Sequence, residues 1–186
     1  MVSGAVLLVV LCGTMSPALC CDWLRHYGHL SNSSLTLLQL MGGQLTDQDS
    51  PVPFPNKLYE QIRNTGVESQ LVFIKDSLEL IAALYRHDNL SSVTWDTDRT
   101  EHFLMSLDRQ TEELNACVPS NRRADSRLRR YFRRLDTSTL RRTGGSAASW
   151  ELLRKETRAH LEQLDLLVAS ILHRPPAASR RRRGAQ

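Results

Sequence analysis

The 186-residue sequence predicts an all-α fold, a single bundle of five main helices with a long first crossover. Apolar residues recur at steps of three and four along most of the chain, which is the period of an amphipathic helix. Alternating β-branched residues, the usual signature of strands, are scarce. Residues 44–56 contain three prolines, so they separate the first helical pattern from the next without being helical themselves. A crossover of that length fits an up-up-down-down arrangement.

The early helices are marked by turn residues as well as by their apolar period. Ser33 or Ser34 is the expected N-cap of the first helix, which carries several leucines and ends at Gly42 and Gly43. A short helix is expected at residues 57–64, after the crossover. The next helix is clearer, because apolar side chains recur along one face. These are Leu71, Ile74, Leu78, Ile81 and Leu84 or Tyr85.

The later helices follow the same pattern. One helix is expected from about residue 96 to residue 118, and an arginine-rich helix at residues 124–142 is closed by two glycines. The last and longest helix covers about residues 146–173, where two prolines stop it. Its apolar stripe consists of Ala147, Trp150, Leu153, Thr157, Leu161, Leu164, Val168 and Ile171.

The N-terminal segment is typical of a secretory signal peptide. An apolar run of seven residues is followed by small residues, and Ala18 and Cys20 suit the −3 and −1 positions of signal peptidase. Removal of residues 1–20 would leave a secreted, extracellular helical domain at residues 21–173 and a disordered basic tail at residues 174–186. No later segment is uncharged over the roughly 20 residues that a membrane-spanning helix needs.

Cleavage after Cys20 would leave two cysteines, Cys21 and Cys117, in an oxidising compartment. A disulfide between them is the economical prediction. It would close a loop of about 96 residues, for which the chain-entropy model gives a stabilisation of about 5 kcal/mol. Two free buried thiols are the alternative.

Charge is divided unevenly along the chain. Seven basic and fourteen acidic residues precede Arg122, whereas seventeen basic and six acidic residues lie from Arg122 onward. This asymmetry indicates a charged contact face or tail. Weak binding of sulfated glycans or anionic membranes, or cleavage by a proprotein convertase, would involve Arg180, Arg181, Arg182 and Arg183. The alternative is a solvated tail without a partner. Nucleic acid is not an expected partner, because aromatic residues are not interleaved with the tail and the leader directs the chain out of the cell.

The sequence contains no arrangement typical of catalysis or metal binding. The six histidines form no H-E-x-x-H motif, and the cysteines are too few and too far apart for a structural zinc site. Neither a glycine-rich phosphate loop nor a G-x-S-x-G motif is present. We therefore expect a protein that is not an enzyme and that uses no cofactor.

Two N-glycosylation sequons are present, at Asn32 and Asn89. Both lie near expected helix ends, where surface exposure suits modification of a secreted chain. The alternative is a chance match, because the motif has only three residues.

Several short strings occur in the order in which one protein family has them. From the expected mature N-terminus onward they are CDWL, VPFP, SSVTWDTDRTEHF, LNACV, LRRYFRRL and SWELLRKE. Together with the leader and the helix count, they resemble a type I interferon over nearly the whole mature chain. Most mammalian alpha-type members have a second disulfide, and Gln44 and Ala148 occupy its positions here. The sequence is therefore most similar to the two-cysteine interferons of fish.

The resemblance implies a helical cytokine with antiviral activity. Such a protein joins two class II cytokine-receptor chains and thereby triggers JAK-STAT signalling and antiviral gene induction. The resemblance also implies the pairing of Cys21 with Cys117. The alternative interpretations are another class II helical cytokine and a cationic protein that acts directly on microbes.

The family's first receptor site maps onto the crossover and the last helix. By position, the candidates are Leu45, Asp47, Gln48, Arg154, Lys155, Arg158 and Glu162. Gln48 stands where the family often has arginine. The four residues of the last helix are expected outside its apolar stripe and therefore exposed, although such a face is often merely solvated. Arg129, in the arginine-rich helix, is the candidate for the opposite receptor face.

Overall fold

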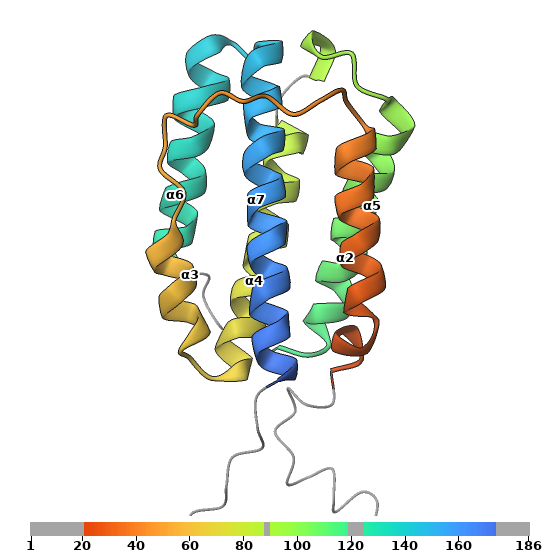
Figure 1. Ribbon diagram of the computed structural model, residues 1–186, viewed down its shortest axis with the longest axis vertical. Coiled ribbons are helices and arrows are strands. Elements are labelled where there is room, and N and C mark those ends of the chain that lie inside the picture. The colour runs from red at the N-terminus through yellow and green to blue at the C-terminus, as the bar shows by residue number, and fades with distance from the viewer. Residues whose placement is uncertain (1–20, 88–89, 119–124, 174–186) are drawn as a thin grey trace, which may run out of the picture.

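Figure 1 shows the computed structural model, which describes residues 21–87, 90–118 and 125–173. Within these ranges the chain forms six α-helices, two short helical segments of other types and no strand. The elements are α2 (Asp22–Leu40), α3 (Asn56–Arg63), α4 (Val67–His87), η2 (Leu90–Ser92), α5 (Thr97–Asn115), α6 (Ser126–Asp136), η3 (Thr137–Arg141) and α7 (Ala147–Leu172).

The four longest helices run up, up, down and down. In Figure 1, α2 and α4 rise, α5 and α7 descend, and α6 rises along one edge of the bundle. The crossover, residues 41–55, passes in front of the upper part of α7 before it reaches α3 (Figure 1). α2 packs on α5 and α7, whereas α4 packs on α5, α6 and α7. The predicted fold class is confirmed.

The first helix begins much earlier than predicted. α2 starts at Asp22, directly after Cys21, so Ser33 and Ser34 lie inside the helix and neither is its N-cap. Ser34 is fully buried, and its hydroxyl donates a hydrogen bond to the Leu30 carbonyl oxygen at 3.1 Å. Hydrogen bonding of this kind lets a serine occupy a helix interior, where its polar side chain would otherwise compete with the backbone.

The helices α5 and α7 begin and end close to where the sequence places them. α5 begins after Asp96, whose carboxylate accepts a hydrogen bond from the Arg99 backbone N–H at 2.9 Å. α7 begins after Ser146, which caps the Ser149 N–H at 3.4 Å, and ends at Leu172. Each cap satisfies a backbone donor that has no partner within its helix.

The arginine-rich segment is less regular than predicted. Beyond Asp136 the chain leaves α-helical geometry for the π-helical turn η3, which brings Thr139 and Leu140 into buried positions. Gly144 then takes a positive φ of 64°, a conformation that favours glycine. The inner face of α6 consists of Leu128, Tyr131, Phe132 and Leu135.

The predicted disulfide is present. Cys21 and Cys117 are joined, which links the residue before α2 to the chain directly after α5 and closes a separation of 96 residues. Cys21 is buried, with 3% of its surface exposed. The disulfide therefore fixes the N-terminal end of α2 at the base of the bundle.

A buried aromatic cluster ties the crossover to three helices. Phe54, in the crossover, stacks on Tyr59 of α3 with ring centroids 5.6 Å apart, and its ring lies 4.6 Å from that of His160 in α7. His160 is fully buried, and its Nδ1 shares a hydrogen bond of 2.6 Å with the Tyr59 hydroxyl. Tyr131 of α6 packs on His160 and donates a hydrogen bond to Glu156 at 2.8 Å.

The stability that His160 contributes should depend on pH. Burial lowers the pKa of its imidazole from 6.5 to about 3. Below pH 6.5 the unfolded chain therefore takes up a proton that the folded protein excludes, and stability falls by about 1.4 kcal/mol per pH unit until the folded pKa is reached. Two carboxyls change stability in the opposite direction as the pH falls. Burial raises the pKa of Asp76 to about 6 and also raises that of Glu156, so their protonation at lower pH favours the folded protein.

Comparison of the wild type with His160→Gln isolates the histidine, because the carboxyls are common to both proteins. Between about pH 7 and about pH 4.5, the free energy of unfolding of the wild type relative to the variant should fall by about 2–3 kcal/mol. Urea titrations at a series of pH values measure this difference. Parallel pH profiles would contradict a buried, neutral His160.

Candidate functional site

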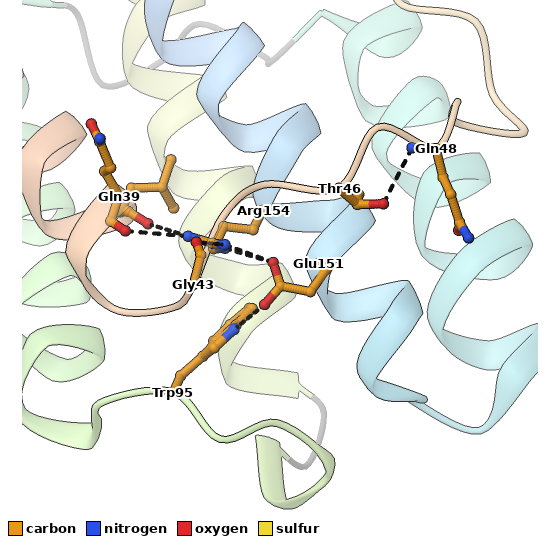
Figure 2. Close-up of polar contacts among 8 residues, drawn as sticks. Gln39, Gly43, Thr46, Gln48, Trp95, Glu151 and Arg154 are labelled. Atoms are coloured by element: carbon orange, nitrogen blue, oxygen red, sulfur yellow. Dashed lines mark hydrogen bonds and ion pairs between the residues drawn. The ribbon is translucent and has the colours of Figure 1, made fainter.

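Arg154 lies beneath the crossover, between the C-terminal end of α2 and the N-terminal part of α7, as Figure 2 shows. Its guanidinium donates to the backbone carbonyls of Leu38 at 3.2 Å, Gln39 at 3.3 Å and Gly43 at 2.6 Å. It also forms a two-point contact with the Glu151 carboxylate, at 2.9 Å from Nε and 2.7 Å from Nη2. The last carbonyls of a helix lack intrahelical partners and carry partial negative charge, so Arg154 acts as a cap for α2.

The loop before α5 closes the same arrangement. The Trp95 Nε1–H donates to Glu151 at 2.6 Å, and the Arg154 guanidinium carbon lies 5.9 Å from the centroid of the Trp95 ring (Figure 2). A β-carbon on Gly42 would lie 2.8 Å from the Trp95 side chain, so glycine permits this close approach. The start of the crossover is thus held by α7 and by the indole together.

Lys155 holds the next part of the crossover. Its Nζ donates to the Gln48 carbonyl oxygen at 2.7 Å and to that of Asp47 at 3.4 Å. The carboxylate of Asp49 lies 3.8 Å away and is fully exposed, which makes this ion pair a weak one. Asp47 and Gln48 are exposed, whereas Leu45 is half-buried. The backbone of the crossover is therefore fixed while these two polar side chains remain accessible.

An exposed row on α7 continues this face. Arg158 and Glu162 form an ion pair of 2.8 Å one turn apart, and both side chains are exposed. Leu166, four residues beyond Glu162, is 53% exposed. We did not predict this residue, although its four-residue spacing from Glu162 was visible in the sequence. We call this surface the crossover face. Its exposed residues are Asp47, Gln48, Arg158, Glu162 and Leu166, and its half-buried residues are Leu45 and Lys155.

The expectation that Arg154 is exposed is wrong. Its side chain is 0% exposed, and it is among the largest fully buried side chains of the described residues. Position 154 is four residues after Trp150 and three before Thr157, both of which are buried. Helical spacing therefore places it on the inner face of α7. Arg154 positions the crossover, and its side chain is not accessible to a partner.

Arg129 lies apart from the crossover face. It is exposed on α6 and lines a groove of about 330 Å³ between α4 and α6. Leu80 and Leu84 of α4 contribute apolar surface to this groove, and Arg133 and Arg141 lie along it. The structure does not bring Arg129 together with the other candidate residues.

The structure places one of the two sequons. Asn32 is exposed, but it lies in the middle of α2 and not near a helix end, because α2 begins at Asp22. Asn89 and the tail arginines Arg180 to Arg183 lie outside the described residues.

Metal binding and membrane spanning find no support within the described ranges. No group of three or more histidine, cysteine, aspartate or glutamate side chains there could hold a metal ion. Among the helices in those ranges, none combines the length and the apolar character needed to cross a bilayer.

Comparison with known proteins identifies the family. The interferon alpha/beta domain model matches residues 24–171. Interferon a3 of Oncorhynchus mykiss is 42% identical over 172 residues, which cover 92% of this chain and 98% of that protein. Interferon alpha of Felis catus is 28% identical over 171 residues, which cover 83% of this chain and 87% of that protein.

A solved structure agrees with this result. Zebrafish interferon 1 superposes with a TM-score of 0.73 at 32% sequence identity, over 81% of this chain and 99% of that chain. An up-up-down-down bundle with a long first crossover defines a helical cytokine. Within that class, the chain belongs to the interferon alpha/beta family. The resemblance recognised from the sequence is confirmed, including its fish affinity, since the trout protein is more similar than the feline one.

Proposed function

We propose that this interferon is a secreted antiviral cytokine that brings together two chains of a class II cytokine receptor. The complex would then trigger JAK-STAT signalling and antiviral gene induction. Membership of the interferon alpha/beta family supports the proposal. The structural observation that carries it is the crossover face, where buried Arg154 holds the loop and polar side chains remain exposed.

The crossover face has the features of a protein-binding surface. Its backbone is held by Arg154 and Lys155, so little loop ordering should be required when a receptor chain binds. Its exposed side chains carry both signs of charge, on Asp47, Arg158 and Glu162, which favours a specific orientation of the partner. We propose that this face binds the first receptor chain.

The second receptor chain is proposed to bind the groove between α4 and α6. Arg129 and Arg133 border this groove, and Leu80 and Leu84 give it an apolar component. Apolar contact surrounded by charged groups is typical of protein interfaces. Two separate faces would allow one ligand to hold two receptor chains at the same time.

Reporter cells provide the direct test of function. Cells that carry both receptor chains and an antiviral promoter reporter should respond to the protein, whereas cells lacking either chain should not. A response in cells without both chains would overturn the proposal. Deleting residues 175–186 should leave the response largely intact, while a direct antimicrobial protein would lose most of its activity.

The double variant Arg158→Glu with Leu166→Glu should weaken binding to one receptor chain by about tenfold or more, because it reverses a charge and introduces one on an apolar contact. Both side chains are exposed, so the free energy of unfolding should change by less than about 1 kcal/mol. Surface plasmon resonance with each receptor ectodomain separately gives the affinities.

A matched control is available on α5. Arg109 forms an exposed pair with Glu113 at 3.0 Å, and Met105 is 64% exposed, so Met105→Glu with Arg109→Glu makes the same change of charge in similar surroundings. The chain that binds the crossover face should retain its affinity for this control. Unchanged affinity of the α7 variant for both chains, or equal losses in variant and control, would exclude the assigned face.

We also propose that residues 1–20 are removed on secretion and that Asn32 and Asn89 accept N-linked glycans. The exposure of Asn32 on α2 supports its modification. N-terminal sequencing and peptide mapping of the secreted protein would test both proposals.

A further inference from the structure

The outward side of α6 is covered by arginines. Its apolar side chains face the core, and the remaining circumference carries the exposed residues Arg127, Arg129, Arg130, Arg133 and Arg134. Exposed Arg141 and Arg142 continue this charge beyond the helix. Figure 1 shows that α6 forms one edge of the bundle, so these side chains gather on a single surface.

Neighbouring carboxylates neutralise only part of this charge. Arg127 pairs with Asp125 at 2.8 Å, and Arg141 pairs with Asp136 at 2.7 Å. Among the arginines of residues 126–142, four exposed ones have neither an ion pair nor a side-chain hydrogen bond. One of them, Arg133, borders the groove between α4 and α6, and we call the other three the arginine face. They are Arg130, Arg134 and Arg142. Uncompensated positive charge of this density attracts polyanions.

The spacing suits a repeating anion. Arg130 and Arg134 are four residues apart, so they lie on the same side of α6, about 6 Å apart along the axis. The planar guanidinium presents paired donors that match the oxygen atoms of tetrahedral oxyanions. The helix fixes the backbone positions of these arginines, so binding has to order only their side chains.

The composition of this surface favours a polyanion over a protein or a nucleic acid. A protein interface needs apolar anchors, but the aromatic residues of α6, Tyr131 and Phe132, are buried in the core. Single-stranded nucleic acid needs exposed aromatic rings for stacking, and α6 presents none. We propose that the arginine face binds linear sulfated polysaccharides, which would retain the protein near cell surfaces. This inference is independent of receptor binding.

Heparin is the probe for the test. The triple variant Arg130→Gln, Arg134→Gln and Arg142→Gln, made in the full secreted chain, should bind immobilised heparin about tenfold or more weakly at roughly 0.15 M NaCl. The slope of log affinity against log salt concentration should fall by about two to three, because three ionic contacts are lost. Circular dichroism should show an unchanged helical content, since the three side chains are exposed.

The control variant removes the same charge elsewhere. Arg25→Gln, Arg86→Gln and Arg109→Gln change exposed arginines on α2, α4 and α5, each of which forms only a surface ion pair. Heparin affinity of this control should remain within about twofold of the wild type. Equal losses of heparin affinity in the two variants would show that binding depends only on net charge, and would overturn the proposal. Retention by the triple variant, with loss on neutralising Arg180 to Arg183, would assign binding to the tail and also overturn it.

A receptor role for the arginine face is tested in cells that lack sulfated glycosaminoglycans. There the triple variant and the wild type should give equal reporter responses. A weaker response from the variant in those cells, with heparin binding unchanged, would make the face a receptor surface and overturn the proposal.

Discussion

Replacing Arg154 with methionine is expected to lower the free energy of unfolding by about 3–5 kcal/mol. The guanidinium is fully buried and serves the carbonyls of Leu38, Gln39 and Gly43 together with the Glu151 carboxylate. Methionine replaces the aliphatic part of the side chain, so much of the packing is kept, but the three carbonyls and the Glu151 carboxylate lose their arginine donor. Unsatisfied buried groups and an unpaired partially buried carboxylate each carry a desolvation cost. Urea titration at neutral pH measures the effect.

Arg158→Met is the matched control, because this side chain is 47% exposed and pairs with Glu162 on the surface. Its effect should be below about 0.5 kcal/mol. The positioning role of Arg154 has a second signature, since loss of the contact with Gly43 should make the crossover more sensitive to limited proteolysis. Similar stability and similar protease resistance in the two variants would rule out that role.

The helices that the sequence predicts well are those whose inner faces are continuous. α4 and α7 bury leucines and isoleucines at steps of three and four, so local spacing is enough to find them. α2 contains the polar stretch around Ser31 and Ser34, which resembles a helix start. Both serines are buried because other helices satisfy them, through Asp165 for Ser31 and through Ser106 for Ser34. Partners so far apart in the sequence cannot be recognised from a local pattern.

The candidate site shows the same limit. The sequence resemblance indicated the crossover and α7, and the structure places those segments side by side. The sequence resemblance did not distinguish buried Arg154 from exposed Arg158, because it assigned both side chains to the same receptor face. The distinction arises from the crossover and α2, which cover the first and supply carbonyl acceptors, while the second faces solvent. Arg154 lies four residues after Trp150 and three before Thr157, so its spacing places it on the inner face, and the prediction that it lies outside the apolar stripe was wrong.

Loss of the disulfide is expected to have the second large effect. Cys21 and Cys117 close a separation of 96 residues, for which the chain-entropy model gives a stabilisation of about 5 kcal/mol. Observed losses in proteins are about 2–5 kcal/mol, and the contribution acts through the unfolded chain as much as through the folded one. We therefore expect the double variant Cys21→Ser with Cys117→Ser to lose about 3–5 kcal/mol of unfolding free energy.

Reduction of the wild type separates the cross-link from the side chains. Cys21 is packed in the core, so serine at this position adds a cost of its own by burying a hydroxyl. The reduced wild type keeps both sulfur atoms in place and should lose most of the same stability in urea titrations run with and without a reductant. Its unfolding should also show a larger m value, because the unlinked chain exposes more surface when it unfolds. If the reduced protein were as stable as the oxidised one while the double serine variant was weakened, packing of Cys21 would be the cause. Equal losses in both would assign the stabilisation to the link itself, which fixes the start of α2 to the end of α5 across the bundle.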